Sequence, residues 1–244
     1  MITSRHRPHD LVAWMQAESQ DALWSRLPEM QTLEARACED IRRFAGAGCC
    51  YAGWSGGKDS TVLAHLLVLA GVSIPLVRVR CEPVENPEVD LVRDRLLKAH
   101  PSLEYHEVTV WCRQGEDGVW HATGTLERGF REVNRRFGRR HISGVRAAES
   151  GARKIRMRVW GVESPNTLAP IGWWSGEQVF AYLYRHRLPV HPAYAYSLAG
   201  AWPRNRLRVA FLGLRHGTEF GRREWELTYY RQELEALGEA DVIT

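Results

Sequence analysis

A short polar loop follows the first apolar run of the sequence, and its residue types suit the binding of an anion. The segment Tyr51–Ser60 reads YAGWSGGKDS, so the polar residues come directly after a predicted strand and open a predicted helix. Backbone N–H groups and the positive end of the helix dipole converge at such a point. Glycine lets a phosphate group approach the main chain without a Cβ in the way. The residues that we expect to contact a phosphate are Ser55, Gly56, Gly57, Lys58, Asp59 and Ser60.

Two neighbouring side chains of this loop carry opposite charges. Lys58 can neutralise phosphate, whereas Asp59 is unusual beside a polyphosphate unless it binds a magnesium ion or caps the helix. The loop also differs from the GxxxxGKS or GxxxxGKT pattern of ordinary nucleotide hydrolases, because an aspartate stands at the serine or threonine position. A tight turn that binds nothing is the simpler alternative, but the complete run between a strand and a helix favours a phosphate site.

Three segments resemble one known family. The run SGGKDS resembles the signature of the PP-loop ATP pyrophosphatases, which cleave ATP to an adenylate and pyrophosphate. The segment ISGVRAAESGAR is similar to the GxRxxES segment of the phosphoadenosine-phosphosulfate (PAPS) reductase branch of that family. LAPIGWWSGEQVFAYLYRHRLPVHPAY is similar to a further pattern of the same branch, so the resemblance extends from about residue 48 to about residue 196.

The resemblance implies roles for residues that lie far from the loop. Arg146 and Arg153 would face the nucleotide phosphates, where a planar guanidinium pairs with two oxygens at once. For Arg146 the alternative is a surface ion pair with Glu149. The catalytic residues implied by this chemistry are Lys58, Asp59 and Arg146, acting on ATP with magnesium through charge stabilisation rather than through a covalent nucleophile.

The cysteines limit which members of the branch the chain resembles. The five cysteines show no CxxC spacing, and none follows Cys112. A sulfonucleotide reductase needs a cysteine nucleophile near its C-terminal end, and an iron–sulfur cluster needs four cysteine ligands. We therefore expect no iron–sulfur cluster and no reduction of PAPS by a cysteine of this chain.

Among members that use ATP, the chain is most similar to the DndC and SspD types of bacterial DNA phosphorothioation, with the cluster-free SspD type the better fit. That resemblance implies a cysteine desulfurase as partner and DNA as acceptor, with a backbone phosphate activated as an adenylate. Arginine-rich clusters at about 135–140 and 153–158 would neutralise DNA phosphates, although a solvated basic face is the alternative. A sulfonucleotide (PAPS or APS) reductase-like enzyme with a thiol supplied elsewhere, a tRNA thiolation enzyme and a non-catalytic nucleotide sensor are the other functions that the sequence allows.

One cysteine is a candidate sulfur carrier. Cys81 ends the apolar segment PLVRVRC, at the strand end where ligands bind in a doubly wound sheet. It would carry a persulfide if Arg78 and Arg80 lowered its pKa. The alternatives are an inert core thiol, or direct transfer of sulfur from the partner.

The elements that position these residues alternate between strands and helices, which is typical of a parallel sheet with crossover helices. Ser175 and Gln178 form a predicted capping box for a helix that ends before Pro189. We expect strands at about 48–53, 75–81, 104–111 and 140–145, and other helices at about 59–70, 88–99, 125–137 and 222–237. The fold class is therefore α/β, a Rossmann-like parallel sheet with helices on both faces, as in adenine nucleotide alpha hydrolases. Residues 1–46 would be a helical N-terminal extension and residues 47–244 the PP-loop domain.

Composition indicates a globular protein. The 244 residues are 44% hydrophobic and 25% charged, with a net charge of +4. No apolar run approaches the ~20 residues of a membrane span, and the opening MITSRHRPHD lacks the apolar core of a signal peptide. We expect a cytoplasmic protein with no membrane partner, and the sequence leaves its oligomeric state open.

Overall fold

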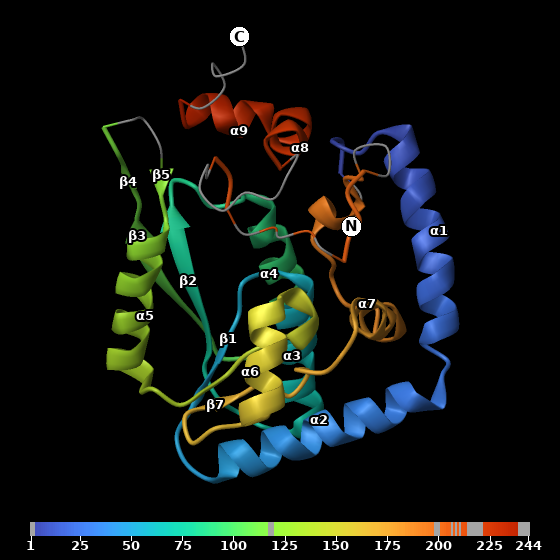
Figure 1. Ribbon diagram of the computed structural model, residues 1–244, viewed down its shortest axis with the longest axis vertical. Coiled ribbons are helices and arrows are strands. Elements are labelled where there is room, and N and C mark those ends of the chain that lie inside the picture. Colours follow the sequence, from blue (N-terminus) through green and yellow to red (C-terminus); the bar gives the residue numbers. More distant parts are fainter. Residues whose placement is uncertain are drawn as a thin grey trace.

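A five-stranded parallel sheet forms the centre of the computed structural model (Figure 1). The structure describes residues 3–116, 120–197 and 201–238, apart from 206, 208, 210 and 214–221. The strands lie in the order β3-β2-β1-β6-β7, with bounds Tyr105–Trp111, Leu76–Glu82, Tyr51–Gly53, His141–Ile142 and Thr167–Leu168. The chain thus builds outward from β1 on one side and then returns to its other side at β6. This arrangement confirms the expected α/β class with a Rossmann-like parallel sheet.

Alternating residues of the strands serve two different cores. On one face Tyr51, Val77 and Val108 pack with Val133 of α5 (Thr123–Phe137). On the opposite face Ala52 and other strand residues join a larger core. The helices that contribute to this larger core include α2 (Pro28–Gly46), α3 (Lys58–Ala70), α4 (Glu88–Ala99) and α7 (Gly176–Arg185). Side chains of a strand point alternately to its two faces, which explains this division.

The N-terminal helices pack against the rest of the chain. Met30 and Ile41 of α2 are fully buried in the larger core, and α1 (Pro8–Trp24) lies against α7. Asp10 of α1 accepts hydrogen bonds from the backbone N–H of Ser197 at 3.0 Å and from the Tyr229 hydroxyl at 2.9 Å. The predicted extension therefore shares the core of the α/β domain.

Most predicted elements are present, and the differences have local causes. The capping box of Ser175 and Gln178 begins α7 as predicted. The predicted last helix is two helices, α8 (Arg222–Tyr229) and α9 (Arg231–Ala236), because Tyr230 leaves the helical conformation while its hydroxyl bonds to buried Glu88 at 2.6 Å. The remaining elements were not predicted: α6 (Gly151–Trp160), β7, two 3₁₀ turns (Ala147–Glu149 and Pro192–Ala195) and the ribbon β4–β5 (Arg113–Gln114 and Trp120–His121).

Among the described residues, no helix combines the length and apolar character needed to cross a membrane.

Candidate functional site

The predicted phosphate loop lies where the sheet changes direction. It joins β1 to α3, and the segment after β6 lies beside it, since β1 and β6 are neighbours. In doubly wound sheets the ligand crevice lies at such a switch point, beyond the carboxyl ends of the strands. The fold therefore places both motif segments at one crevice.

Gly56 has the one left-handed backbone conformation of the loop. Its φ is +73°, and a Cβ there would lie 2.3 Å from Cγ1 of Val89 in α4. Gly57 is extended, with a φ of −79° and a ψ of 166°, and a Cβ there would lie 3.3 Å from the Tyr194 hydroxyl. Position 56 thus requires glycine both for its left-handed backbone conformation and for the close contact with Val89. At position 57 glycine leaves space beside the Tyr194 hydroxyl.

A third glycine, which sequence analysis did not single out, allows the two motif segments to approach each other closely. A Cβ on Gly144 would lie 2.9 Å from the carbonyl carbon and oxygen of Asp59 and 3.1 Å from the Ser60 nitrogen. These contacts are with backbone atoms, which cannot swing aside as a flexible side chain would. The glycine of the GxRxxES segment was the available signal, since it precedes Arg146 by two residues.

Three predicted charged residues meet at the start of α3. Asp59 receives Lys58 Nζ on Oδ2 at 3.1 Å and Arg146 Nε on Oδ1. Arg146 also donates from Nη1 to the Trp174 carbonyl at 3.1 Å. Lys58 and Arg146 are only 5% and 2% exposed, so two nearly buried cations share one carboxylate. The positive end of the α3 dipole lies at the same place, and this makes the crevice suitable for a polyanion.

Tyr194 supports the lysine of this group. Its hydroxyl accepts a hydrogen bond from the Lys58 backbone N–H at 3.0 Å, and Lys58 Nζ lies 5.2 Å from the centre of its ring. Burial alone would lower the pKa of Lys58, but the interactions with Tyr194 and Asp59 outweigh it and the pKa is raised. The lysine is therefore a cation at neutral pH. Tyr194 belongs to the LPVHPAY segment, which the sequence linked to the family without assigning this contact.

The ion pair that we considered as the alternative for Arg146 is not formed by its guanidinium. The Arg146 backbone N–H donates to Glu149 Oε2 at 3.0 Å, while its guanidinium bonds to Asp59. Arg153 forms the ion pair with Glu149 instead. Arg153 is half-exposed and also lines the cavity of the crevice.

The remaining loop hydroxyls hold the loop in shape. Ser60 Oγ donates to the Gly57 carbonyl at 3.0 Å and accepts from the Ser55 backbone N–H at 3.1 Å. Ser55 is exposed, whereas Ser60 is buried. In this arrangement Ser55 is the better placed of the two to contact a ligand.

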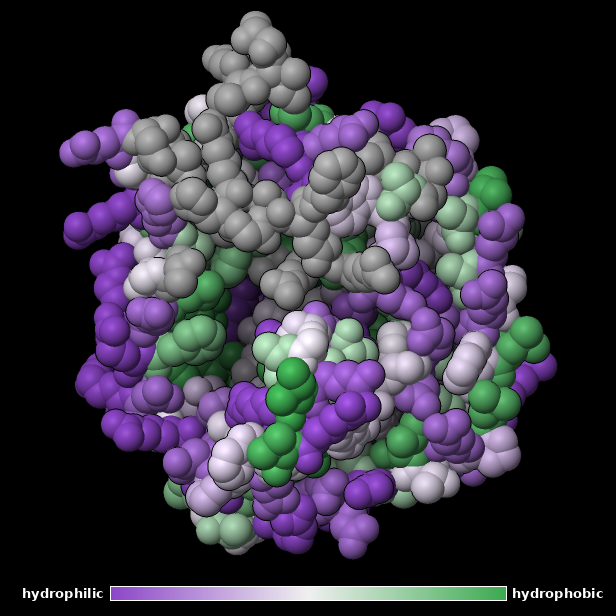
Figure 2. All heavy atoms as spheres, viewed as in Figure 1, coloured by the Kyte–Doolittle hydropathy of each residue, from purple (hydrophilic) through white to green (hydrophobic). Residues whose placement is uncertain are grey.

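A cavity of about 730 Å³ reaches this charged group at Asp59, the one of the three residues that lines it, and runs between α5 and α6. Figure 2 shows the hollow beside α6, with hydrophobic residues on the side of α5. Ser55, Asp59 and Arg153 contribute polar atoms, while Val77 and Phe130 belong to its apolar part. A nucleotide likewise has a polar part and an apolar part, namely a charged phosphate chain and a flat base. The volume of the cavity is also within the range of about 300–1,000 Å³ that is common for ligand sites.

The expected magnesium ligand is already engaged. Each carboxylate oxygen of Asp59 carries a cation, and no group of three or more acidic, histidine or cysteine side chains among the described residues is arranged to hold a metal. Asp59 as placed here offers no free oxygen to a magnesium ion, and its role as a magnesium ligand stays a prediction. We therefore derive no step of the reaction through a metal.

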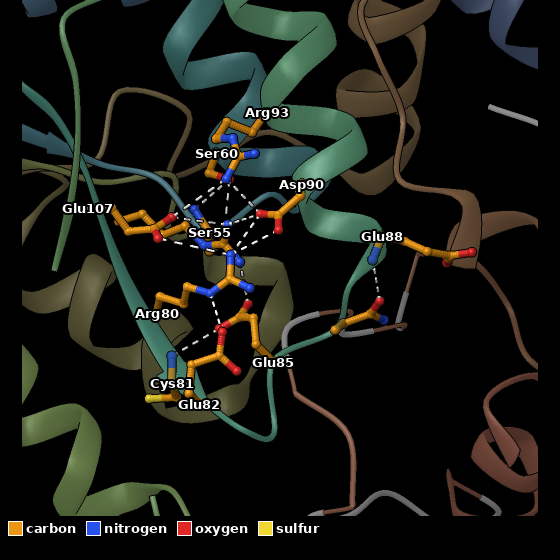
Figure 3. A network of polar contacts seen from close by, with 12 residues as sticks. Ser55, Ser60, Arg80, Cys81, Glu82, Glu85, Glu88, Asp90, Arg93 and Glu107 are labelled. Carbon is orange, nitrogen blue, oxygen red and sulfur yellow. Dashed lines mark hydrogen bonds and ion pairs between the residues drawn. The ribbon is translucent and has the colours of Figure 1, made fainter. Parts of the chain in front are cut away.

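Cys81 lies in surroundings that disfavour the sulfur-carrier prediction. Its side chain has no exposed surface, and a hydrogen bond with Cys112, together with burial, raises the pKa of its thiol. The arginines that were expected to lower that pKa are neutralised by carboxylates, as Figure 3 shows for Arg80. Arg78 bonds to Glu85 at 2.7 Å. The carrier role stays a prediction that a variant must test.

The two arginine-rich clusters differ in how their charges are used. Arg135 and Arg136 of α5 both pair with Glu132, and Arg140 donates to three backbone carbonyls, among them that of Gly48 at 2.7 Å. In the second cluster only Arg153 has an ion-pair partner among the described residues. Lys154, Arg156 and Arg158 of α6 therefore have no carboxylate partner among the described residues.

Comparison with known proteins gives one family match. The phosphoadenosine phosphosulfate reductase domain matches residues 50–207, more than half of the chain. Curated proteins give no match. Similar solved structures include NMN synthetase from Francisella tularensis, at 12% identity and a TM-score of 0.49, covering 88% of this chain and 97% of that one.

Two further structures are similar at the same level. The U34-tRNA thiolase NcsA from Methanococcus maripaludis, with its 4Fe-4S cluster, is 14% identical with a TM-score of 0.47, covering 85% of this chain and 80% of that one. NAD+ synthetase from Burkholderia pseudomallei is 14% identical with a TM-score of 0.45, covering 97% of this chain and 96% of that one. Likeness at these values carries no information about activity.

Proposed function

The chain belongs to the phosphoadenosine phosphosulfate reductase domain family, and we propose that it cleaves ATP to AMP and pyrophosphate in order to adenylylate an acceptor for sulfur transfer. The observation that carries this proposal is the meeting of Lys58, Asp59 and Arg146 at the N-terminus of α3, beside the cavity. Charge builds up on pyrophosphate as it leaves the α-phosphate. Two fixed cations and the N-terminus of a helix are the groups that stabilise such charge.

The cations must change partners for this to occur. In the structure they are held by Asp59, and the phosphates of ATP would replace the carboxylate as their counter-ion. Lys58 and Arg146 then bear on the β- and γ-phosphates, while Ser55 and the N–H groups of the loop contact phosphate oxygens. An oxygen of the acceptor attacks the α-phosphorus, the bond to the β-phosphate oxygen breaks, and pyrophosphate leaves with its electron pair. No covalent intermediate with the chain is needed.

The acceptor that we propose is a backbone phosphate of DNA, with a cysteine desulfurase as the sulfur source. The unpaired cations of α6 beside the cavity support a polyanionic acceptor, because binding to nucleic acid begins with neutralisation of phosphates. The outer sulfur of the desulfurase persulfide then attacks the activated phosphorus and AMP leaves, and a second thiol cleaves the S–S bond, which gives the phosphorothioate and a disulfide. A tRNA acceptor shares the ATP step and is distinguished by offering each nucleic acid in turn.

The test uses ATP labelled in its α-phosphate, magnesium and the purified protein, alone and with DNA, tRNA and a desulfurase. We expect AMP and pyrophosphate, and we expect Lys58→Ala to abolish both products. Lys98→Ala is the matched control, since Lys98 is an exposed lysine of α4. Formation of ADP would overturn the assignment of the loop. ATP binding with no product under any of these conditions would support a nucleotide sensor. Tight binding of PAPS without ATP turnover would support a sulfonucleotide-binding protein.

A further inference from the structure

Helix α6 has an unusual surface for a helix at the edge of a domain. Its sequence, GARKIRMRVW, contains four cations and no acidic residue. Met157 is its one buried residue. Ile155, Val159 and Trp160 are 65%, 64% and 75% exposed, so large apolar side chains lie open among the charges. Figure 2 shows hydrophobic and hydrophilic residues side by side over this helix.

The charges of this helix are available to a ligand. Lys154, Arg156 and Arg158 are exposed, and none forms an ion pair with any residue that the structure describes. On α5, by contrast, Glu132 pairs with both Arg135 and Arg136. Three exposed cations without a carboxylate partner among the described residues thus lie on one short helix, α6, which extends over about 15 Å for its ten residues.

The helix also leads into the cavity. Arg153, Arg156 and Trp160 line it together with Asp59 and Ser60 of the phosphate loop. A molecule that lies along α6 would therefore have one end beside the charged group at which ATP is proposed to react.

We infer that α6 binds a single-stranded, or locally unpaired, segment of the nucleic-acid acceptor, with its phosphates on Lys154 and Arg158, which share one side of the helix, and a base stacked on Trp160. This inference rests on the proposed function for the identity of the strand as acceptor. Exposed cations neutralise phosphates of any nucleic acid, but an open indole face binds a base only when that base is out of the duplex. Ile155 and Val159 add apolar surface for sugars and bases. Charge complementarity selects a polyanion over an apolar protein partner.

The test measures binding without ATP, so that it is independent of catalysis. Fluorescein-labelled oligothymidylate of about 12 nucleotides, the matching duplex and oligouridylate are titrated with the protein, and anisotropy is followed at several salt concentrations. We expect the single strands to bind more tightly than the duplex. Trp160→Ala should weaken single-strand binding at least about fivefold, and Trp160→Phe should restore most of it.

The cations are tested by the salt dependence of binding. Replacing Lys154 and Arg158 together by glutamine should reduce the slope of log affinity against log salt by about 1.4, since each phosphate contact on a single strand contributes about 0.7. Arg135→Gln removes the same type of charge from a paired site on α5 and should leave the slope unchanged. A decrease of about 0.7 in the slope of Arg135→Gln, the same loss per charge removed, would mean that binding depends on the net charge of the protein and not on α6.

Three other results would overturn the inference. The first is tighter binding of the duplex than of the single strand, and the second is unchanged binding of the single strand by Trp160→Ala. The third is self-association of the protein, detected by light scattering and abolished by Ile155→Asp, which would make α6 a protein interface. Lys58→Ala separates this inference from the proposed function. That variant should bind the oligonucleotide like the unaltered protein while it forms no AMP, so strand binding and ATP cleavage fail independently.

Discussion

Replacement of Gly144 by alanine tests whether the two motif segments depend on their close approach. The added Cβ would lie 2.9 Å from two backbone atoms of Asp59, and an ordinary contact begins near 3.4 Å, so the start of α3 must move by about 0.5 Å. Displacement of a reacting group by about 1 Å costs about a hundredfold in rate, so we expect AMP formation to fall about tenfold. Overpacking of this kind also lowers the free energy of unfolding by about 1–3 kcal/mol.

The assays are AMP formation from labelled ATP and denaturation by urea. Gly124→Ala is the matched control, because Gly124 lies in α5 with no atom near enough to meet a new Cβ. Its stability should stay the same or rise by up to about 1 kcal/mol. If Gly144→Ala behaves like Gly124→Ala in both assays, the close approach of Gly144 to Asp59 has no importance for the site.

Three further changes test other parts of the structure. Asp59→Asn leaves two nearly buried cations without their carboxylate and should lower the free energy of unfolding by about 3 kcal/mol, with part recovered on adding pyrophosphate. Unchanged stability to urea would contradict the shared ion pair. Cys81→Ala should retain sulfur incorporation into the acceptor because the thiol is buried with a raised pKa, whereas loss of incorporation with AMP formation intact would support the carrier role. Burial lowers the pKa of His65 to about 4 and that of His191 to about 3, below the unfolded value of about 6.5, so the unfolded state binds protons first as the pH falls. Stability to urea should thus decrease by about 2 kcal/mol per histidine between pH 7 and pH 5, and a flat profile would refute the buried neutral state of these rings.

The phosphate loop could be predicted from the sequence because its determinants are local. The order of apolar run, glycines and helix is read within ten residues, and Gly56 takes the left-handed conformation that makes a glycine necessary. Arg146 was assigned through family resemblance, since it meets Asp59 only after the sheet brings β6 beside β1. Gly144 and Tyr194 were missed because their importance lies in contacts across the fold.

The arginine-rich clusters show how pairing limits a reading of charge. Both looked alike by composition, but Glu132 stands three and four residues before Arg135 and Arg136, at the spacing that brings side chains together on a helix. That pattern was available in the sequence once α5 was predicted. The second cluster lies on a helix that was not predicted, because α6 buries only Met157 and so lacks the apolar stripe by which an amphipathic helix is found.

The same shortage of buried contacts bears on function. Helix α6 buries only Met157 and leaves Ile155, Val159 and Trp160 exposed beside cations without a carboxylate partner among the described residues, an arrangement that a bound polyanion would stabilise. At the other end of the cavity, two nearly buried cations are tolerable only because Asp59 neutralises them. The exposed cations of α6 have no carboxylate partner among the described residues, and the two cations of the crevice share one carboxylate. The cavity between the two features is lined by Asp59 on one side and by Arg153, Arg156 and Trp160 of α6 on the other. An enzyme that joins a nucleotide phosphate to a phosphate of a polymer needs two anion sites in this relation, and a nucleotide sensor needs only the one in the crevice.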